Sequence, residues 1–356
     1  MNNTMRKNLL LLLGLLYSLG TYATDITKYT PQAEEGIVYF LPKTAIEVNF
    51  VITKTTYQPG EFSQYANRYL RISNISTQPA TRWAIKKIEA RPVGIPDSTK
   101  AYVVKLKDRS VLSNVELTDE GVIKAINTVA PQTDNGMKEV LEKPRKHESG
   151  KKYMTEEILL AGSTAKMAEL TAKEIYNIRE SKNLILRGQV DAMPKDGASL
   201  KLIIDNLDKQ ETAMMELFTG ITDKEDKVYS IKIVPEKDIK DMVITRFSEE
   251  LGVLQADDLG GEPIYISISC MNPVAPQPVP DNKKKAKIQG AIYNMPGKGN
   301  VVINFKHKDV INQEFLFGQF GVTEVLMEGL FNKKNNTKVV FDHTTGGILK
   351  IDKADK

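Results

Sequence analysis

The sequence predicts an α+β protein that is mainly β, with two antiparallel β domains, sandwich- or barrel-like, around a central helical hairpin. Apolar and polar residues alternate with a period of two over much of residues 24–130, and again from residue 227 onward. Between these regions, two stretches carry apolar residues every three or four positions, as amphipathic helices do. A length of 356 residues, 41% of them hydrophobic and 26% charged, suits two compact globular units.

The first 23 residues have the pattern of a secretory signal peptide. Arg6 and Lys7 form a basic start, Leu9–Leu16 is an apolar run, and small residues precede a cleavage point after Ala23. The run is shorter than the ~20 residues that span a bilayer. No cysteine lies directly after it to carry a lipid anchor, and no later segment is long and apolar enough to cross a membrane. We therefore expect a mature chain, residues 24–356, that is periplasmic or extracellular and does not span a membrane.

Charge and residue counts exclude several classes of protein. Removal of Arg6 and Lys7 leaves 47 of the 49 Lys and Arg residues against 45 Asp and Glu residues, a net charge of +2. This charge is too close to zero for general nucleic-acid binding, which depends on neutralising phosphates. A single cysteine excludes an intramolecular disulfide, an all-thiolate zinc site and a cysteine-ligated iron–sulfur cluster. Three histidines leave little material for metal binding. We expect no metal and no cofactor.

Residues 24–150 are expected to form an N-terminal β domain that ends in a polar linker. Apolar residues at every second position of Ala45–Thr53 predict a strand with one face in the core. The 3–4 spacing over Phe62–Leu70 predicts a short helix laid on the sheet. Residues 131–152 are polar and contain prolines and glycines, which predicts an exposed loop or linker. Further strands are expected at Arg82–Ala90, Ala101–Leu106, Val111–Leu117 and Val122–Asn127, the last two joined by a hairpin loop at Thr118–Gly121.

Residues 151–222 are expected to form the helical hairpin. The first helix begins after Ser163, a good N-cap residue, and continues to about Ser181. The second carries an apolar stripe from Leu200 to Phe218 and is closed by Gly220. Two amphipathic helices this close in sequence are expected to bury their stripes on each other and on a sheet.

Residues 223–356 are expected to form a C-terminal β domain. In the strand Ile264–Cys270, strict alternation puts Cys270 on the face of three isoleucines, which predicts a buried, inert thiol rather than a nucleophile. Residues 271–287 contain four prolines followed by four lysines and predict an exposed tether; a basic patch for anionic glycans or lipids is the alternative. Turns are expected at Pro296–Gly299 and Thr345–Gly347. The other expected strands are Lys227–Ile233, Met242–Phe247, Ile288–Tyr293, Val301–Phe305, Gln313–Phe317, Val322–Leu326, Lys338–Phe341 and Ile348–Ile351.

The strongest catalytic candidate is the S-x-x-K sequence from Ser163 to Lys166, at the predicted start of a helix. Penicillin-binding proteins and class A β-lactamases place their nucleophile and its lysine this way, so the alternative function is a serine hydrolase that uses Ser163 and Lys166. The companion motifs would be Ser181–Asn183 and His343–Gly346. However, 18 residues along one helix separate Ser163 from Ser181 by about 27 Å, too far for one cleft. A helix cap explains the same residues, and we predict no catalytic residue.

Carboxylates provide no clearer site. The neighbours Glu249 and Glu250, like Asp257 and Asp258, diverge on either a strand or a helix, so neither pair forms an acid–base dyad. Carboxylates from distant strands could still meet in a cleft, which sequence alone leaves open.

Several stretches of the chain resemble a family of exported Bacteroidetes proteins of unknown function. The similarity covers nearly the whole mature chain and implies an envelope setting, but it implies no activity, cofactor or site residue. The triplet Asp97-Ser98-Thr99 resembles the O-glycan acceptor sequence of such bacteria, with Ser98 as the acceptor. A plain turn explains the same three residues equally well. The similar stretches are Tyr39–Thr44, Tyr57–Phe62, Tyr65–Leu70, Ala161–Ser163, Ile175–Glu180 and Leu217–Gly220.

These observations together predict a non-catalytic protein of the cell envelope. It is expected to bind a glycan, lipid or protein partner, or to help assemble an envelope structure. The first reason is that the sequence contains no convincing catalytic motif. The second is that its predicted β modules carry polar loops, as binding proteins often do.

Overall fold

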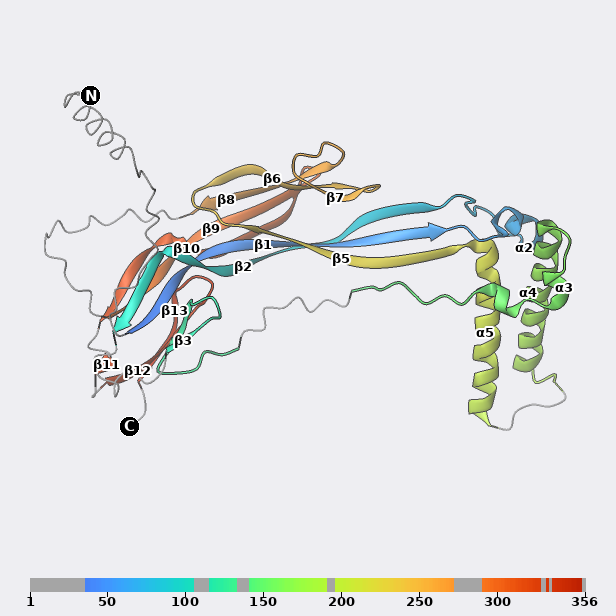
Figure 1. Ribbon diagram of the computed structural model, residues 1–356, viewed down its shortest axis with the longest axis horizontal. Helices are drawn as coiled ribbons and strands as arrows, with labels where there is room; N and C mark the ends of the chain where they lie inside the picture. The colour runs from blue at the N-terminus through green and yellow to red at the C-terminus, as the bar shows by residue number, and fades with distance from the viewer. Residues whose placement is uncertain are drawn as a thin grey trace, which may run out of the picture.

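The protein is elongated, with a β-rich body at one end and a helical hairpin at the other (Figure 1). It is mainly β, its sheets are antiparallel, and its hairpin lies between strands in the sequence, as predicted. The computed structural model describes residues 36–105, 115–132, 141–190, 196–271, 290–327, 331–332 and 335–353. The predicted signal peptide and nearly all of the predicted tether at 271–287 lie outside these residues.

Three long strands connect the two ends. They are β1 (Gly36–Gln58), β2 (Ala80–Lys105) and β5 (Ile221–Ile233), paired in the order β2-β1-β5. All thirteen residues of β5 pair with Ile46–Gln58 of β1, which in turn pairs with β2. At about 3.4 Å per residue, this ladder spans roughly 40 Å. We call the three-stranded part, Ile46–Gln58 with its partners in β2 and β5, the stalk.

The stalk changes character along its length. At its root, Ile46, Val48, Phe50 and Ile52 are fully buried, and they form the apolar face that the alternation predicts. Beyond Ile52, the β1 residues are only partly buried. There the backbone ladder and cross-strand polar pairs hold the strands together, because little apolar surface is available to bury.

The body contains a five-stranded sheet that packs on the root of the stalk. Its order is β10-β9-β8-β6-β7. Isoleucines and phenylalanines from this sheet share one core with the buried face of β1. The strands are β6 (Ile239–Ser248), β7 (Gly252–Leu254), β8 (Glu262–Cys270), β9 (Gly290–Phe305) and β10 (Lys308–Met327).

A second, smaller sheet completes the body. Its order is β11-β12-β4-β3, and β13 pairs with β12. A separate core that includes Tyr39, Leu41 and Phe341 joins it to the start of β1 and to β9. The strands are β3 (Val115–Leu117), β4 (Ile123–Ile126), β11 (Phe331–Asn332), β12 (Asn335–Phe341) and β13 (Ile348–Lys353).

Strand pairing crosses the boundaries expected between the β domains at residues 24–150 and 223–356. β5 pairs with β1, and β12 pairs with β4. Both halves of the chain therefore contribute to the stalk and to the smaller sheet, whereas the large sheet is built from β6–β10 of the C-terminal half alone.

The turn expected at Pro296–Gly299 is instead part of the continuous strand β9. Its glycines provide close packing: a Cβ on Gly297 would lie 2.5 Å from the Phe320 carbonyl oxygen, and one on Gly299 would lie 2.8 Å from the Phe317 ring. The opposing strand β10 has its register shift between Phe317 and Val322. Glycine here marks close approach at an irregularity in the sheet rather than a reversal of the chain.

Six helical segments form the far end of the molecule. Ser163 caps α4 and Gly220, with φ of 75°, ends α5, as predicted. The short helix expected over Phe62–Leu70 forms, but it packs on the hairpin rather than on the sheet, where Phe62, Ala66 and Leu70 join the hairpin core. The segments are two 3₁₀ turns, η1 (Ser63–Tyr65) and η2 (Gly150–Tyr153), and four helices, α2 (Ala66–Leu70), α3 (Glu156–Leu159), α4 (Thr164–Leu186) and α5 (Gly197–Thr219).

Within the described part of the chain, no helix is both long enough and apolar enough to cross a bilayer.

Candidate functional site

The S-x-x-K residues form a helix cap at the far end of the molecule. The Ser163 hydroxyl accepts a hydrogen bond from the Lys166 backbone N–H at 3.2 Å. The Lys166 ammonium lies 2.9 Å from a Glu169 carboxylate oxygen, and this hydrogen-bonded ion pair raises the pKa of Lys166. A lysine held in its protonated form does not accept a proton from serine, so the geometry is that of a cap.

The companion motifs do not converge on Ser163. Ser181 and Asn183 lie near the other end of the same helix, α4. His343 lies in the β body, in the loop between β12 and β13, where its backbone packs against β2; a Cβ on Gly94 would come within 1.9 Å of the His343 carbonyl oxygen. The stalk separates this loop from the hairpin (Figure 1).

Two other sequence candidates occupy ordinary structural positions. Asp97, which is nearly buried, accepts hydrogen bonds from the Thr99 backbone N–H at 3.0 Å and from its hydroxyl at 2.6 Å, while Ser98 is exposed on β2. Cys270 is a free, partly buried thiol that packs against the core of the body. Asp97–Thr99 lies within β2, at the irregularity where the register with β1 shifts between Phe40 and Pro42, and the hydrogen bond from the Thr99 N–H to the Asp97 carboxylate is that of an Asx-turn.

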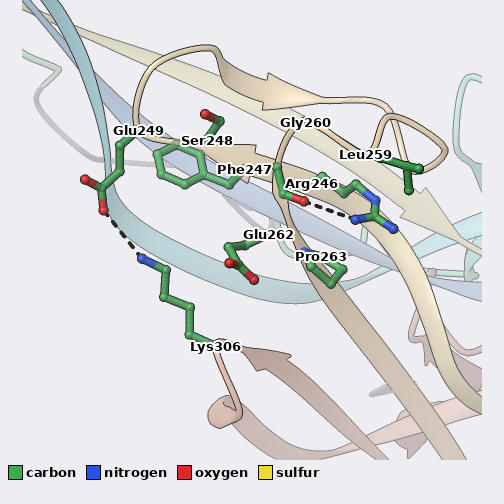
Figure 2. Close-up of a pocket in the computed structure, with 10 residues that line it drawn as sticks. Arg246, Phe247, Ser248, Glu249, Leu259, Gly260, Glu262, Pro263 and Lys306 are labelled. Carbon is green, nitrogen blue, oxygen red and sulfur yellow. Dashed lines mark hydrogen bonds and ion pairs between the residues drawn. The ribbon is translucent and has the colours of Figure 1, made fainter.

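A groove of about 470 Å³ lies at one end of the large sheet, among β6, β8 and the turn between β9 and β10 (Figure 2). β6 contributes Arg246, Phe247 and Ser248, followed by Glu249. The loop after β7 contributes Leu259 and two glycines, the start of β8 contributes Glu262 and Pro263, and Lys306 closes the groove from the turn. Strands distant in sequence therefore bring charged groups of both signs together.

Arg246 fixes the wall of the groove. Its guanidinium donates to the carbonyl oxygens of Ala256 at 2.9 Å and Gly261 at 3.0 Å, which pins the loop after β7. On the opposite side, the Lys306 ammonium lies 3.4 Å from a Glu249 carboxylate oxygen, and both side chains are more than half exposed. The fixed wall and the open ion pair make a surface that can exchange its own polar contacts for those of a ligand.

The groove brings together carboxylates from different parts of the chain, a possibility that the sequence left open. Glu249 and Glu262, thirteen residues apart, line the same hollow, and Figure 2 shows Lys306 reaching toward it from below. Sequence reasoning missed this grouping. The only signal for it was the Gly260-Gly261 pair, where a Cβ on Gly261 would lie 2.9 Å from the Phe247 backbone and so prevent the loop from closing on β6.

A second charged cluster fastens the segment before the hairpin to the stalk. We call residues 141–149 the strap. The Asp226 backbone N–H donates to the Glu142 carbonyl oxygen at 2.9 Å, and the Glu142 N–H donates to an Asp226 carboxylate oxygen at 3.0 Å. Burial acts to raise the pKa of Asp226, but the ion pair with Lys86 and the hydrogen bonds from Thr53 and Glu142 outweigh it and lower the pKa to about 2.

His147 provides the second attachment of the strap. Its Nδ1 lies 2.8 Å from a Glu216 carboxylate oxygen and its Nε2 lies 2.9 Å from one of Asp223. Hydrogen bonds to Asp223 and Glu216 raise the pKa of His147, because only the imidazolium can donate from both ring nitrogens. The bridge spans the junction between the last turn of α5 and the first residues of β5. Within the described residues, no group of three His, Cys, Asp or Glu side chains is placed to hold a metal ion.

Comparison with known proteins identifies a family but no characterised relative. A family model described as "Domain of unknown function (DUF4831)" matches residues 35–349. No curated protein and no solved structure matches the chain. The matched residues include both the body and the hairpin of this chain.

Proposed function

We propose that this chain, which belongs to the DUF4831 family of domains of unknown function, is a non-catalytic envelope protein that holds two binding ends apart. One end is the β body with its groove, and the other is the helical hairpin. In this role the protein binds a glycan, lipid or protein partner, or helps to assemble an envelope structure.

The stalk is the observation that carries this proposal. The three-stranded ladder is thirteen residues long, and its outer part, Thr53–Gln58, carries the hairpin roughly 20 Å beyond the core of the body. The core of the hairpin shares no residue with either core of the body. A protein that needed only one site would have no use for this separation, whereas a spacer or adaptor depends on it.

The groove at the body end suits a hydroxyl-rich or peptide ligand. Lys306, Glu249 and Glu262 offer donors and acceptors at its open side, and Arg246 keeps the wall in place. Such ligands are bound mainly by hydrogen bonds to a few placed polar groups.

Export is part of the proposal and is supported by the sequence. The basic start, the apolar run and the small residues before Ala23 have the pattern of a cleaved signal peptide. Purification of the chain from cells, followed by mass spectrometry of its N-terminus, tests this part. A mature chain that begins at residue 24 supports export, and a chain from the envelope or cytoplasm that retains residues 1–23 contradicts it.

The two-ended function can be tested by photo-crosslinking in cells that express the chain. A photoreactive amino acid is placed at Leu259 beside the groove, at Leu186 on the hairpin, or at Val228 in the stalk as a control. These side chains are 83%, 71% and 37% exposed. We expect discrete adducts from the two end positions and none from Val228.

Adducts from the stalk position alone, or the absence of adducts from either end, would refute the two-ended function. The purified chain should also remain unlabelled by a fluorescent β-lactam.

A further inference from the structure

The hairpin meets the stalk where the chain crosses three times between strands and helices. Each crossing contains a proline or a glycine, and Gly220, between α5 and β5, has φ of 75°. In Figure 1, α5 runs across the axis of the stalk rather than along it. We call these crossings the joint; they contain Pro59 and Gly60 after β1, Pro79 before β2, and Gly220 before β5.

Apolar packing does not hold the joint in the described part of the chain. The core of the hairpin contains no residue of β1, β2 or β5. The cores of the body contain no residue of β1 beyond Ile52. Polar contacts across the joint therefore decide how firmly the hairpin is held relative to the stalk.

Tyr57 provides one of these contacts, next to Gly220. Its hydroxyl, at the end of β1, lies 2.8 Å from the Ser76 carbonyl oxygen and 3.2 Å from the carbonyl oxygen of Thr219, the last residue of α5. A Cβ on Gly220 would lie 2.7 Å from the Tyr57 ring. This contact fixes one point of the joint, and a second contact at some distance is needed to fix the angle between α5 and the stalk.

The strap crosses the joint beside these segments. On the stalk it is attached to β5 through the two hydrogen bonds between Glu142 and Asp226. On the hairpin it leads into η2, which packs on α5 so closely that a Cβ on Gly150 would lie 2.3 Å from the Ala213 carbonyl oxygen. The strap is therefore anchored on both sides.

His147 provides the second contact, between the two anchors of the strap. Its Nδ1 lies 2.8 Å from a carboxylate oxygen of Glu216, which precedes Gly220 on α5. Its Nε2 lies 2.9 Å from a carboxylate oxygen of Asp223, which follows Gly220 on β5. One imidazole ring thus connects the helix and the strand that meet at Gly220.

Only the protonated ring can make both contacts. Carboxylates accept hydrogen bonds, and a neutral imidazole has one N–H and one lone pair, so loss of the proton leaves a lone pair facing a carboxylate. Hydrogen bonds to Asp223 and Glu216 raise the pKa of His147 in the folded chain. The bridge is therefore complete below about pH 6.5, the ordinary pKa of histidine, and is lost as the pH rises past the raised pKa.

The surroundings of the ring let the bridge open locally. In the described part of the chain, the charged groups that face the ring are the carboxylates of Glu216 and Asp223. The side chains of His147, Glu216 and Asp223 are 20%, 19% and 32% exposed, so water can replace a lost contact without exposure of a core. Charged neighbours on the strap and η2 are paired with other groups: Glu148 with Lys152, and Lys151 with Glu61.

We propose that His147 is a pH-sensitive latch on the joint. With the imidazolium in place, α5 and β5 are connected at two points, and the hairpin is held at one angle to the stalk. When the ring gives its proton to water, the contact of Tyr57 remains and the hairpin swings about Gly220. The hairpin core and the strand ladder persist in both states, because neither includes His147. The latch thereby sets the relative orientation of the two ends of the molecule.

Double electron–electron resonance between two spin labels measures the angle at the joint. The labels are attached to the purified chain after Leu202→Cys in α5 and Val228→Cys in β5, positions that are 62% and 37% exposed. Each position is roughly 27 Å from Gly220 along its own element. Cys270→Ser removes the native thiol, which lies in the body. We expect one narrow distance distribution at about pH 5.5 and a distribution about twice as wide at about pH 9.

The midpoint of this change must coincide with the titration of His147 itself. NMR of the imidazole rings follows that titration, and His147→Gln identifies the signal among the three histidines of the chain. The same variant should show equal distribution widths at both pH values, because glutamine does not titrate. Glu216→Gln removes one carboxylate and should move the transition to lower pH by about one unit. The control His307→Asn, on the exposed turn between β9 and β10, should leave the transition unchanged.

Three results would overturn the proposal. The first is a distribution of equal width at both pH values in the unaltered joint. The second is a transition that persists in His147→Gln or whose midpoint differs from that of His147. The third is loss of helical circular dichroism over the same pH range, which would show unfolding of the hairpin instead of a change of angle. None of these results bears on the two-ended function, which the crosslinks in cells test separately.

Discussion

Replacing Phe218 with alanine should destabilise the helical hairpin and leave the stability of the β body unchanged. Phe218 is fully buried near the end of α5, and its ring centroid lies 5.4 Å from that of Phe62. Both rings belong to the hairpin core, which shares no residue with the two cores of the body. Loss of the ring therefore acts on one end of the molecule, which the polar half of the stalk and the strap join to the rest in the described part of the chain.

The size of the effect follows from the burial. Truncation of a fully buried phenylalanine costs about 3–5 kcal/mol. Because each 1.4 kcal/mol is a factor of ten, the population of open hairpin should rise roughly 10²- to 10⁴-fold. Hydrogen exchange measured by mass spectrometry reads this opening directly, since protected amides exchange in proportion to the open population. Amides of Thr171–Ile178 should exchange faster by that factor, and those of β8 and β9 should change little.

The reciprocal variant is the control. Phe317→Ala removes an equally buried ring from the body, where Phe317 packs 4.7 Å from Phe320. It should accelerate exchange in β8 and β9 and leave the hairpin protected. Equal loss of protection at both ends in either variant would refute the reasoning, because it would make the stalk part of a single cooperative unit.

Two further predictions concern the polar residues His147 and Ser163. The pKa of His147 is raised in the folded state, so the strap should be fully fastened below pH about 6.5 and should loosen as the pH rises past the raised value. His147→Gln should remove this dependence and cost about 1–2 kcal/mol at low pH, since the replaced contacts are charge-assisted and partly exposed. Protection factors, which correct the exchange rate for its intrinsic rise with pH, measure the strap, and equal protection of residues 141–149 at about pH 5.5 and 8.5 would contradict the prediction. Ser163→Ala should lower the stability of α4 by about 1 kcal/mol through loss of its cap, seen as a lower urea midpoint. Neither the variant nor the original chain should be labelled by a fluorescent β-lactam, and Ser163-dependent labelling would establish the hydrolase alternative.

Local patterns in the sequence were sufficient for several elements. The alternation Ile46, Val48, Phe50, Ile52 predicted a buried strand face, and Ser163 and Gly220 predicted the ends of the helices. These features depend on interactions within a few residues: the side-chain period of a strand, the hydrogen bond of a cap, and the positive φ that glycine tolerates. The same local reasoning identified Ser163 and Lys166 as a helix cap.

Tertiary contacts decided the rest. The chain alone does not reveal that β5 pairs with β1 over thirteen residues, and so the stalk was not predicted. The groove is likewise assembled from Glu249, Glu262 and Lys306, which no motif connects. Pro296–Gly299 has the composition of a turn, yet it forms strand because the Phe317 and Phe320 region of β10 packs directly over its glycines. The sequence by itself determined most of the segments that are strands and helices, because their periods are local. The separation into two ends and the gathering of charges came only from pairing between distant strands.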